Sequence, residues 1–545
     1  MKKSSLTKTI AAVMGAAMVC SATASSAFAV SVSDVKLNTN KTADAKEVFN
    51  FDFEEESDLK YFTNRGGDDT TEISITSDEA KSGKSSLLAS GRTESWNGPA
   101  FRLDGVLEPN TEYTISASVK GKYYTGAMLS YQYTVDGETK YSNLVQNLNG
   151  SDWQSVKDVK ISFTDEMEGV YVYFEGGSDD LYVDSFVIKE VPQVEIEKDI
   201  PSLSAIYAND FKVGTAITPD NLASRPFMDL VSKHFGESIT VGNEMKPENV
   251  LNFNATQAYM EETGDDENPQ VSFAAAKPIL NYCQKNNIPV RVHTLVWHSQ
   301  TPDWFFKKGY KADGDWVDKD TMLKRMENYI KAVFTAVKEE YPTINFYAWD
   351  VVNEAWTDSG TPRQGGEQGQ SGSENSAWVK VFGDNSFIKY AFQYARKYAP
   401  EGCKLYVNDY NEYMDAKCND IYNMAKKIMQ AGDYIDGIGM QSHLATNYPD
   451  INTYTAAMDK FLSLGLELQI TELDIETKSN PSARAKLFAD VFQMAVNNSA
   501  QIPALTVWGT HDDISWRRSE TPLLFTSGYK AKDDYTQVMA VDTSK

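Results

Sequence analysis

Short alternating runs of apolar and polar residues fill the chain from residue 46 to residue 190. The stretch TEYTISASVKG (111–121) places Tyr, Ile, Ala and Val on one face, and GVYVYFEGG (169–177) alternates in the same way. A two-residue period is typical of strands that bury one face, and Gly-, Asn- and Asp-rich turns separate these runs. This pattern predicts a β-sandwich of jelly-roll type over 46–190.

The pattern changes after VPQVEIEKDIP (191–201), a charged segment with proline near each end that we interpret as a linker. From 202 to 540, apolar strand-like runs alternate with helical stretches such as 321–340, whose apolar residues keep a spacing of three and four. The strand-like runs are 211–217, 238–245, 289–298, 345–355, 404–411, 435–443, 466–475 and 504–513. This alternation predicts a (β/α)8 barrel, and hence a multidomain chain.

Residues 1–29 have the features of a secretory signal peptide. Lysines at 2, 3 and 8 precede a short apolar core, and Ala27-Phe28-Ala29 fits a cleavage site before Val30. The apolar core is too short to span a bilayer, and no later apolar run reaches about 18 residues. We therefore expect a secreted, extracellular protein that does not insert into a membrane.

Composition narrows the choice of partners. The net charge of −25 argues against nucleic acid or an anionic membrane surface as a ligand. Beyond the predicted signal peptide the cysteines are Cys283, Cys403 and Cys418, an odd number without the spacing of a metal site. The sequence leaves a disulfide between Cys403 and Cys418 open, and we expect a monomer.

Polar groups follow the apolar strands of the predicted barrel, at the end where barrel enzymes carry their chemistry. Glu354 ends the fourth strand and Glu472 the seventh, so both face the mouth of the barrel. Two carboxyl groups across a cavity are the machinery of glycoside hydrolysis, in which one is protonated and the other ionised. Their surroundings must therefore separate their pKa values. Tryptophans at other strand ends suit the C–H faces of sugars.

Seven stretches give residues 200–535 a resemblance to glycoside hydrolase family 10, the endo-β-1,4-xylanases. They are NEMKPEN, RVHTLVWHSQTPDWF, WDVVNEAW, LYVNDYN, IDGIGMQSHL, ITELDI and SWRRSETPLLF, in that order along the chain. The resemblance implies a retaining mechanism without a catalytic cofactor. It assigns the acid/base to Glu354, the nucleophile to Glu472 and the contact with the sugar 2-hydroxyl to Asn353. It also implies that His443, supported by Asp474, keeps Glu472 ionised.

The same resemblance implies a set of substrate-binding residues. On the glycone side they are Asn243, Lys246, His293, Trp297 and Gln300. Near the catalytic pair they are Gln441, Trp508 and Trp516, and the aglycone side begins at Tyr410 and Asn411. The chain departs from the family pattern at Gly242, where an acid usually precedes the asparagine, and at Val292, where a glycine is usual. The Gly-, Ser- and Gln-rich stretch Thr357–Ser376 is predicted to be a mobile loop near the aglycone side.

The N-terminal region resembles carbohydrate-binding module family 22. The matching stretches are FEEESDLKYFTNRG, SGKSSLLASGRTESWNGP and VYFEGGSDDLYVDSFVI. The resemblance implies a xylan-binding cleft formed by Arg65, Trp96, Tyr141, Tyr173 and Glu175. Tyr173 and Glu175 are two positions apart on one strand, so they share a sheet face, as joint contact with a ligand requires. The resemblance also implies a structural calcium site near Glu54 and Asp184.

We therefore expect a secreted endo-1,4-β-xylanase that binds xylan through its N-terminal module. Two alternatives stay open. Barrels with the same two glutamates also cleave other β-glycans, so a retaining glucanase on cellulose or mixed-linkage β-glucan is the second hypothesis. A non-catalytic cell-wall-binding protein is the third, and the intact set of Glu354, Glu472, His443 and Asn353 argues against it.

Overall fold

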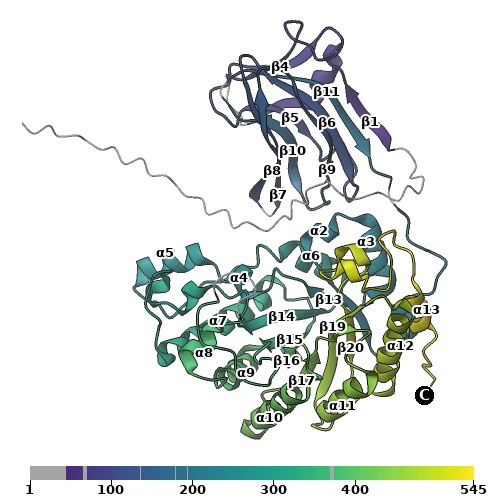
Figure 1. The fold of residues 1–545 in the computed structure, drawn as a ribbon. Coiled ribbons are helices and arrows are strands. Elements are labelled where there is room, and N and C mark those ends of the chain that lie inside the picture. The colour runs from purple at the N-terminus through teal and green to yellow at the C-terminus, as the bar shows by residue number, and fades with distance from the viewer. Residues whose placement is uncertain are drawn as a thin grey trace, which may run out of the picture. The chain divides into compact units, whose positions relative to one another are not determined.

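The computed structural model describes residues 45–65, 70–135, 137–177, 179–192, 194–368 and 374–544 (Figure 1). The predicted signal peptide lies outside these residues. No helix in the described ranges is long and apolar enough to cross a membrane.

Residues 46–190 form two antiparallel sheets, as the alternating pattern predicted. One sheet has the strand order β3-β4-β11-β6-β9, with β1 paired to β11, and the other has the order β2-β5-β10-β7-β8. The strands are β1 (Lys46–Phe51), β2 (Phe62–Arg65), β3 (Glu72–Thr76), β4 (Ser86–Ser90), β5 (Gly98–Arg102), β6 (Tyr113–Gly121), β7 (Thr125–Val135), β8 (Glu138–Gly150), β9 (Gln154–Ile161), β10 (Glu168–Glu175) and β11 (Leu181–Glu190). Alternate residues of β6 and β10, among them Ile115, Val119, Val170 and Val172, are fully buried between the sheets.

The C-terminal region is a closed parallel barrel ringed by helices (Figure 1), which confirms the predicted fold class. Its strands pair in the order β17-β16-β15-β14-β13-β12-β20-β19-β18, and an additional β17–β19 pairing closes the ring. They are β12 (Lys212–Ile217), β13 (Ser238–Val241), β14 (Val290–Trp297), β15 (Phe346–Asn353), β16 (Lys404–Asp409), β17 (Gly437–Met440), β18 (His443–Ala445), β19 (Glu467–Glu476) and β20 (Ala504–Val507).

The segments between the barrel strands are helical, and the longest helix shows why. The helices are α1 (Leu203–Tyr207), α2 (Pro219–Leu222), α3 (Arg225–Leu230), α4 (Pro247–Val250), α5 (Phe253–Thr263), α6 (Lys277–Asn286), α7 (Lys319–Glu340), α8 (Ala377–Phe382), α9 (Phe387–Tyr398), α10 (Asp415–Ala431), α11 (Ile451–Leu462), α12 (Pro481–Asn497) and α13 (Asp533–Met539). In α7, Met326, Ile330 and Val337 are buried on one face. The Asp318 side chain accepts a hydrogen bond from the Thr321 amide. This amide has no partner within the helix, so Asp318 caps the N-terminus of α7.

One strand prediction was wrong in detail. The sixth run, 435–443, was expected to form a single strand, but β17 ends at Met440 and β18 begins at His443. Ser442 between them has a φ of 59°, a left-handed conformation that interrupts the strand. The break sends His443 into a separate pairing with β19, where it lies opposite Asp474.

Below the mouth of the barrel lies a buried ion pair that the sequence analysis did not predict. Both guanidinium Nη atoms of Arg291 donate to the carboxylate of Asp350, at 2.7 and 2.5 Å, and Nε donates to Gln469 at 3.0 Å. Neither charged side chain of the pair is exposed beyond 1%. Because each charge is paired and hydrogen-bonded, the barrel interior can hold them at tolerable desolvation cost.

The three described cysteines, Cys283, Cys403 and Cys418, are free and buried, so the disulfide that the sequence left open is not formed. Part of the predicted linker contributes to the barrel, because Ile196 is buried in the C-terminal hydrophobic core.

Candidate active site

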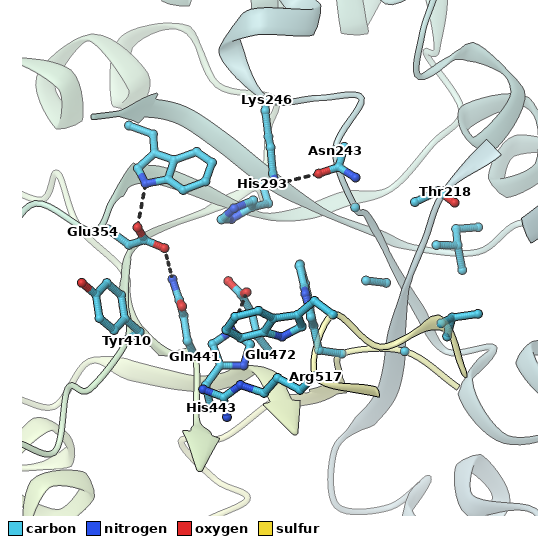
Figure 2. Close-up of a pocket in the computed structure, with 18 of the residues that line it drawn as sticks. Thr218, Asn243, Lys246, His293, Glu354, Tyr410, Gln441, His443, Glu472 and Arg517 are labelled. Carbon is cyan, nitrogen blue, oxygen red and sulfur yellow. Dashed lines mark hydrogen bonds and ion pairs between the residues drawn. The ribbon is translucent and has the colours of Figure 1, made fainter. Parts of the chain in front are cut away.

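A cavity of about 680 Å³ opens at the carboxyl ends of the barrel strands (Figure 2). Twelve residues predicted from the sequence line it: Asn243, Lys246, His293, Trp297, Glu354, Tyr410, Asn411, Gln441, His443, Glu472, Trp508 and Trp516. Glu354 and Tyr410 lie on one side of the cavity, Asn243 and Thr218 lie on the other, and Glu472 lies between them. The remaining barrel predictions, Gln300, Asn353 and Asp474, do not line the cavity but contact the lining residues Lys246, Gln441 and His443.

Glu472 lies on β19 with only 6% of its side chain exposed. Its Oε2 is 3.3 Å from His443 Nε2, and its Oε1 accepts a hydrogen bond of 2.9 Å from the Asn408 side-chain amide. Burial alone raises the pKa of this carboxyl group. The hydrogen bond from His443 and the charges of His293 and His443 outweigh burial and lower the pKa to about 2. Glu472 is therefore ionised at any physiological pH, as a nucleophile must be.

His443 lies between Glu472 and Asp474. Its Nδ1 lies 3.0 Å from Oδ2 of the fully buried Asp474. Burial lowers the pKa of the imidazole, but the Asp474 charge beside Nδ1 and the contact of Nε2 with Glu472 raise it to about 10. Asp474 is itself fixed by Trp516, whose Nε1 donates at 2.8 Å, and by Arg517 Nη1 at 3.2 Å.

Glu354 follows the last residue of β15 and faces neutral donors instead of a cation. Trp297 Nε1 donates to its Oε2 at 2.9 Å, and Gln441 Nε2 donates to its Oε1 at 3.1 Å. The backbone of Glu354 has a φ of 52°, and its amide donates to the Asn408 carbonyl at 2.9 Å. The left-handed backbone directs the carboxylate into the cavity from the strand end.

A chain of side-chain amides links the two carboxylates. The buried Asn353 amide lies 3.0 Å from that of Asn408 and 3.2 Å from that of Gln441. The Asn408 amide also donates to Glu472, and the Gln441 amide also donates to Glu354. These contacts fix the relative orientation of the pair across three strands. They also leave the two carboxylates with different partners, because Glu472 contacts the His443 imidazole whereas Glu354 accepts from the neutral Trp297 and Gln441 side chains.

On the side away from Tyr410, polar groups converge on Lys246. Its Nζ donates to Asn243 at 2.7 Å and to Gln300 at 3.0 Å, and it lies 5.1 Å from the centre of the Trp297 ring. Burial lowers the pKa of Lys246, although the nearby Glu472 and Glu354 carboxylates oppose this. His293 is held by Asp350, which lies 2.9 Å from its Nδ1. This cluster presents donors and an aromatic edge suited to sugar hydroxyl groups.

Several residues of the site were missed by sequence reasoning. Thr218, Asn221, Gly242, Ile514 and Arg517 line the cavity as well. Gly242 was noted only as a departure from the family pattern, and Arg517 only within SWRRSETPLLF. Asn408 lies within LYVNDYN, and the sequence analysis assigned it no role. No local signal distinguishes these residues from ordinary strand ends and loops.

The β-sandwich carries a second cavity, of about 720 Å³, lined by all five residues predicted for ligand binding. The guanidinium of Arg65 lies over the rings of Tyr173 and Tyr141 at 4.7 and 5.2 Å and pairs with Glu175 at 3.6 Å. Trp96 is 47% exposed and Tyr141 is 61% exposed. Open aromatic faces beside fixed polar groups are suited to a polysaccharide chain.

The two carboxylates predicted to bind calcium both accept backbone amides from one loop. Glu54 accepts from the amides of Lys84 and Ser85, and Asp184 accepts from those of Lys81 and Ser82. Calcium prefers six to eight oxygen ligands. The described residues contain no group of three or more His, Cys, Asp or Glu side chains placed to hold a metal. The two amides bound to Glu54 both contact Oε1, and the two bound to Asp184 both contact Oδ2. Calcium binding stays a prediction.

A parallel barrel with two glutamates opposed across its mouth defines the class of protein as a glycoside hydrolase. Residues 202–541 match glycosyl hydrolase family 10, and residues 45–181 match a carbohydrate binding domain. The family match covers more than half of the chain, so the chain belongs to glycosyl hydrolase family 10.

Two similar proteins are named as endo-1,4-β-xylanases. The chain is 52% identical over 340 residues to the bifunctional endo-1,4-β-xylanase XylA of Ruminococcus flavefaciens, covering 62% of this chain and 34% of that protein. It is 33% identical over 502 residues to endo-1,4-β-xylanase Y of Acetivibrio thermocellus, covering 86% and 45%. It therefore spans about a third to a half of the length of these relatives.

A similar solved structure covers both domains. It contains the N-terminal carbohydrate-binding and family 10 modules of endo-1,4-β-D-xylanase 10B from Clostridium thermocellum, in complex with xylohexaose. The TM-score is 0.61 at 32% identity, and the alignment covers 92% of this chain and 98% of that one.

Proposed function

We propose that the protein is a secreted endo-1,4-β-xylanase that hydrolyses internal linkages of xylan with retention of anomeric configuration. The observation that carries the proposal is the contrast between the two glutamates. Glu472 is buried beside the His443 imidazolium, whereas Glu354 accepts hydrogen bonds from Trp297 and Gln441. The proposed substrate agrees with the names of the relatives and with the xylohexaose bound by the similar structure.

In the first step, a carboxylate oxygen of Glu472 attacks the anomeric carbon, and a covalent glycosyl–enzyme ester forms as the glycosidic bond breaks. The carboxylic acid of Glu354 transfers its proton to the departing sugar oxygen. The contact between His443 and Glu472 must weaken in this step, because the carboxylate loses its negative charge when the ester forms. The Asn408 side chain donates to Oε1 of Glu472 and holds this oxygen in place during the step.

In the second step, Glu354, now a carboxylate, removes a proton from water while the water oxygen attacks the anomeric carbon. The ester to Glu472 breaks, its carboxylate is regenerated, and the product has the configuration of the substrate. We assign the contact with the sugar 2-hydroxyl to Asn353. Its side chain is hydrogen-bonded to Asn408 and Gln441, which contact the two carboxylates. Lys246, Asn243 and His293 would bind the sugars on the glycone side.

The proposed role of the β-sandwich is to hold the enzyme on xylan through the cavity at Arg65, Trp96 and Tyr173. Its open aromatic faces and the pairing of Arg65 with Glu175 support this role. Attachment raises the local concentration of cleavable chains at the barrel.

Hydrolysis with stereochemical detection tests the proposed activity. We expect the protein to release reducing sugars from xylan, and ¹H NMR at early times to show the β-anomer first. Release from β-glucan but not from xylan would favour the alternative glucanase. First appearance of the α-anomer would contradict retention. Glu472→Ala should abolish turnover of xylan while its circular dichroism spectrum and xylan binding stay close to wild type, because it removes the attacking oxygen without opening a large void.

A further inference from the structure

Arg363 lies outside the cavity but contacts two of the residues that line it. It belongs to the loop after β15 and is 2% exposed. Its Nε donates to the main-chain carbonyl of Glu354 at 2.7 Å, and its Nη2 donates to the Tyr410 hydroxyl at 3.3 Å. Its Nη1 forms an ion pair with Glu374, farther along the same loop. One buried guanidinium therefore joins the acid/base residue, the neighbouring aromatic wall and the loop.

The backbone of Glu354 depends on such contacts. A φ of 52° is uncommon for a non-glycine residue and persists where the surroundings hold it. The Glu354 amide is bound to the Asn408 carbonyl, whereas its own carbonyl accepts from Arg363. Because Glu354 lies beyond the end of β15, these bonds replace the strand ladder in setting the direction of its carboxylate.

Tyr410 is fixed at both its hydroxyl and its ring. The ring centre lies 3.6 Å from Nζ of Lys417, which is buried and paired with Asp409 at 2.8 Å. Arg363 contacts the hydroxyl from the other end. Tyr410 lies next to Glu354 on the side of the cavity away from Asn243 (Figure 2). The acid must be close to the leaving oxygen, so this side receives the departing sugar.

We propose that Arg363 is a positioning residue for the acid/base step, because it sets the Glu354 carboxyl relative to the wall on which the leaving sugar lies. The proposal rests on the retaining hydrolase activity proposed above. The guanidinium matches this task because its rigid planar fork presents Nε, Nη1 and Nη2 to three acceptors that lie in different directions, whereas an ammonium donates from a single nitrogen. Its loss shifts the proton donor relative to the leaving oxygen and leaves the nucleophile Glu472 untouched.

Leaving-group dependence distinguishes this role from a purely structural one. In Arg363→Lys, we expect kcat/KM on xylan to fall about 100-fold, the cost of displacing a catalytic group by about 1 Å. On 2,4-dinitrophenyl β-xylobioside, kcat/KM should stay near wild type, since this leaving group departs without a proton. Azide should accelerate turnover of the aryl glycoside in the variant and yield the β-xylobiosyl azide, because it replaces the water that Glu354 activates.

Arg484→Lys is the matched control. Arg484 is another buried arginine, paired with Asp534 at 2.6 Å and outside the cavity lining, and its loss should lower the melting temperature without changing the ratio of the two kcat/KM values. If Arg363→Lys does not fold, Tyr410→Phe removes only the hydroxyl contact and should show the same substrate dependence with a smaller fall.

Equal falls in kcat/KM on both substrates, or wild-type kcat/KM on xylan in Arg363→Lys, would overturn the proposal. A wild-type protein that cleaves neither xylan nor the aryl xylobioside would instead overturn the proposed function.

Discussion

His443 and Asp474 lie opposite each other in the parallel pair β18–β19, with 3.0 Å between Nδ1 and Oδ2. The pairing places a fully buried carboxylate behind the imidazole, while the opposite ring nitrogen faces Glu472. A single register thus determines the charge of the histidine and, through it, the charge of the proposed nucleophile. The break between β17 and β18 is what makes this register available.

Asp474→Asn should weaken the nucleophile without removing it. Loss of the Asp474 charge lowers the pKa of His443. The imidazole then stabilises the Glu472 carboxylate less, so the pKa of Glu472 rises. We expect the acidic limb of the kcat/KM profile to move up by at least about one pH unit, which corresponds to about 1.4 kcal/mol. Measuring kcat/KM on xylo-oligosaccharides from pH 2 to pH 7 checks this. An acidic limb identical to that of wild type would exclude the role given to Asp474.

The His443 pair should also make stability fall at high pH. Its folded pKa of about 10 lies above the ordinary value of 6.5, so its contribution is fully present below about pH 6.5 and is lost as the pH rises through 10. His443→Gln cannot titrate in this range. We expect the unfolding free energy of the wild type to decrease more steeply than that of the variant between pH 7 and pH 10, in urea titrations at fixed ionic strength. Parallel curves would contradict this linkage.

Glu412 is a fully buried carboxyl group that the proposed reaction does not use. Its Oε1 accepts from the Ser442 amide at 3.3 Å, while its Oε2 has no partner among the described residues. Burial raises its pKa from 4.5 to about 7. The stability that it contributes is therefore present below about pH 4.5 and is lost as the pH rises through 7.

Glu412→Gln should remove this loss. Relative to wild type, we expect the variant to gain roughly 3 kcal/mol of stability between pH 4.5 and pH 8, with the change spread over the interval from pH 4.5 to pH 7. Thermal melts of both proteins at pH 4.5 and pH 8 measure the difference. If the difference in stability is the same at both pH values, Glu412 does not titrate as its burial implies.

Trp96→Ala should weaken attachment to xylan through the β-sandwich. Trp96 lines the second cavity and is half exposed, so its ring is available to stack on a sugar. In a Glu472→Ala background, which prevents hydrolysis, we expect affinity for insoluble xylan to fall roughly tenfold. Tyr123→Ala is the control, because Tyr123 is 76% exposed but lies outside the cavity lining. Equal losses in the two variants would indicate nonspecific adhesion.

The sequence predicted the fold and the outline of the site well for an identifiable reason. The alternation of apolar runs with amphipathic helices is a local property, and it located the eight strands of the barrel to within a few residues. It did not reveal the break at Ser442, which arises from one left-handed residue within an apolar run. Nor did it indicate the Arg291–Asp350 pair, because charged residues within strands usually point to solvent, and only closure of the barrel buries both.

By itself, the sequence determined which residues stand at the carboxyl ends of parallel strands, because strand direction and strand ends follow from the local pattern. Only the tertiary structure decided which of them meet. Gln441 reaches Glu354, Asn408 reaches Glu472, and Arg363 reaches Tyr410 across long separations in the chain. These contacts depend on barrel closure, strand register and loop conformation, which arise from packing between distant segments and leave no periodic trace in the sequence.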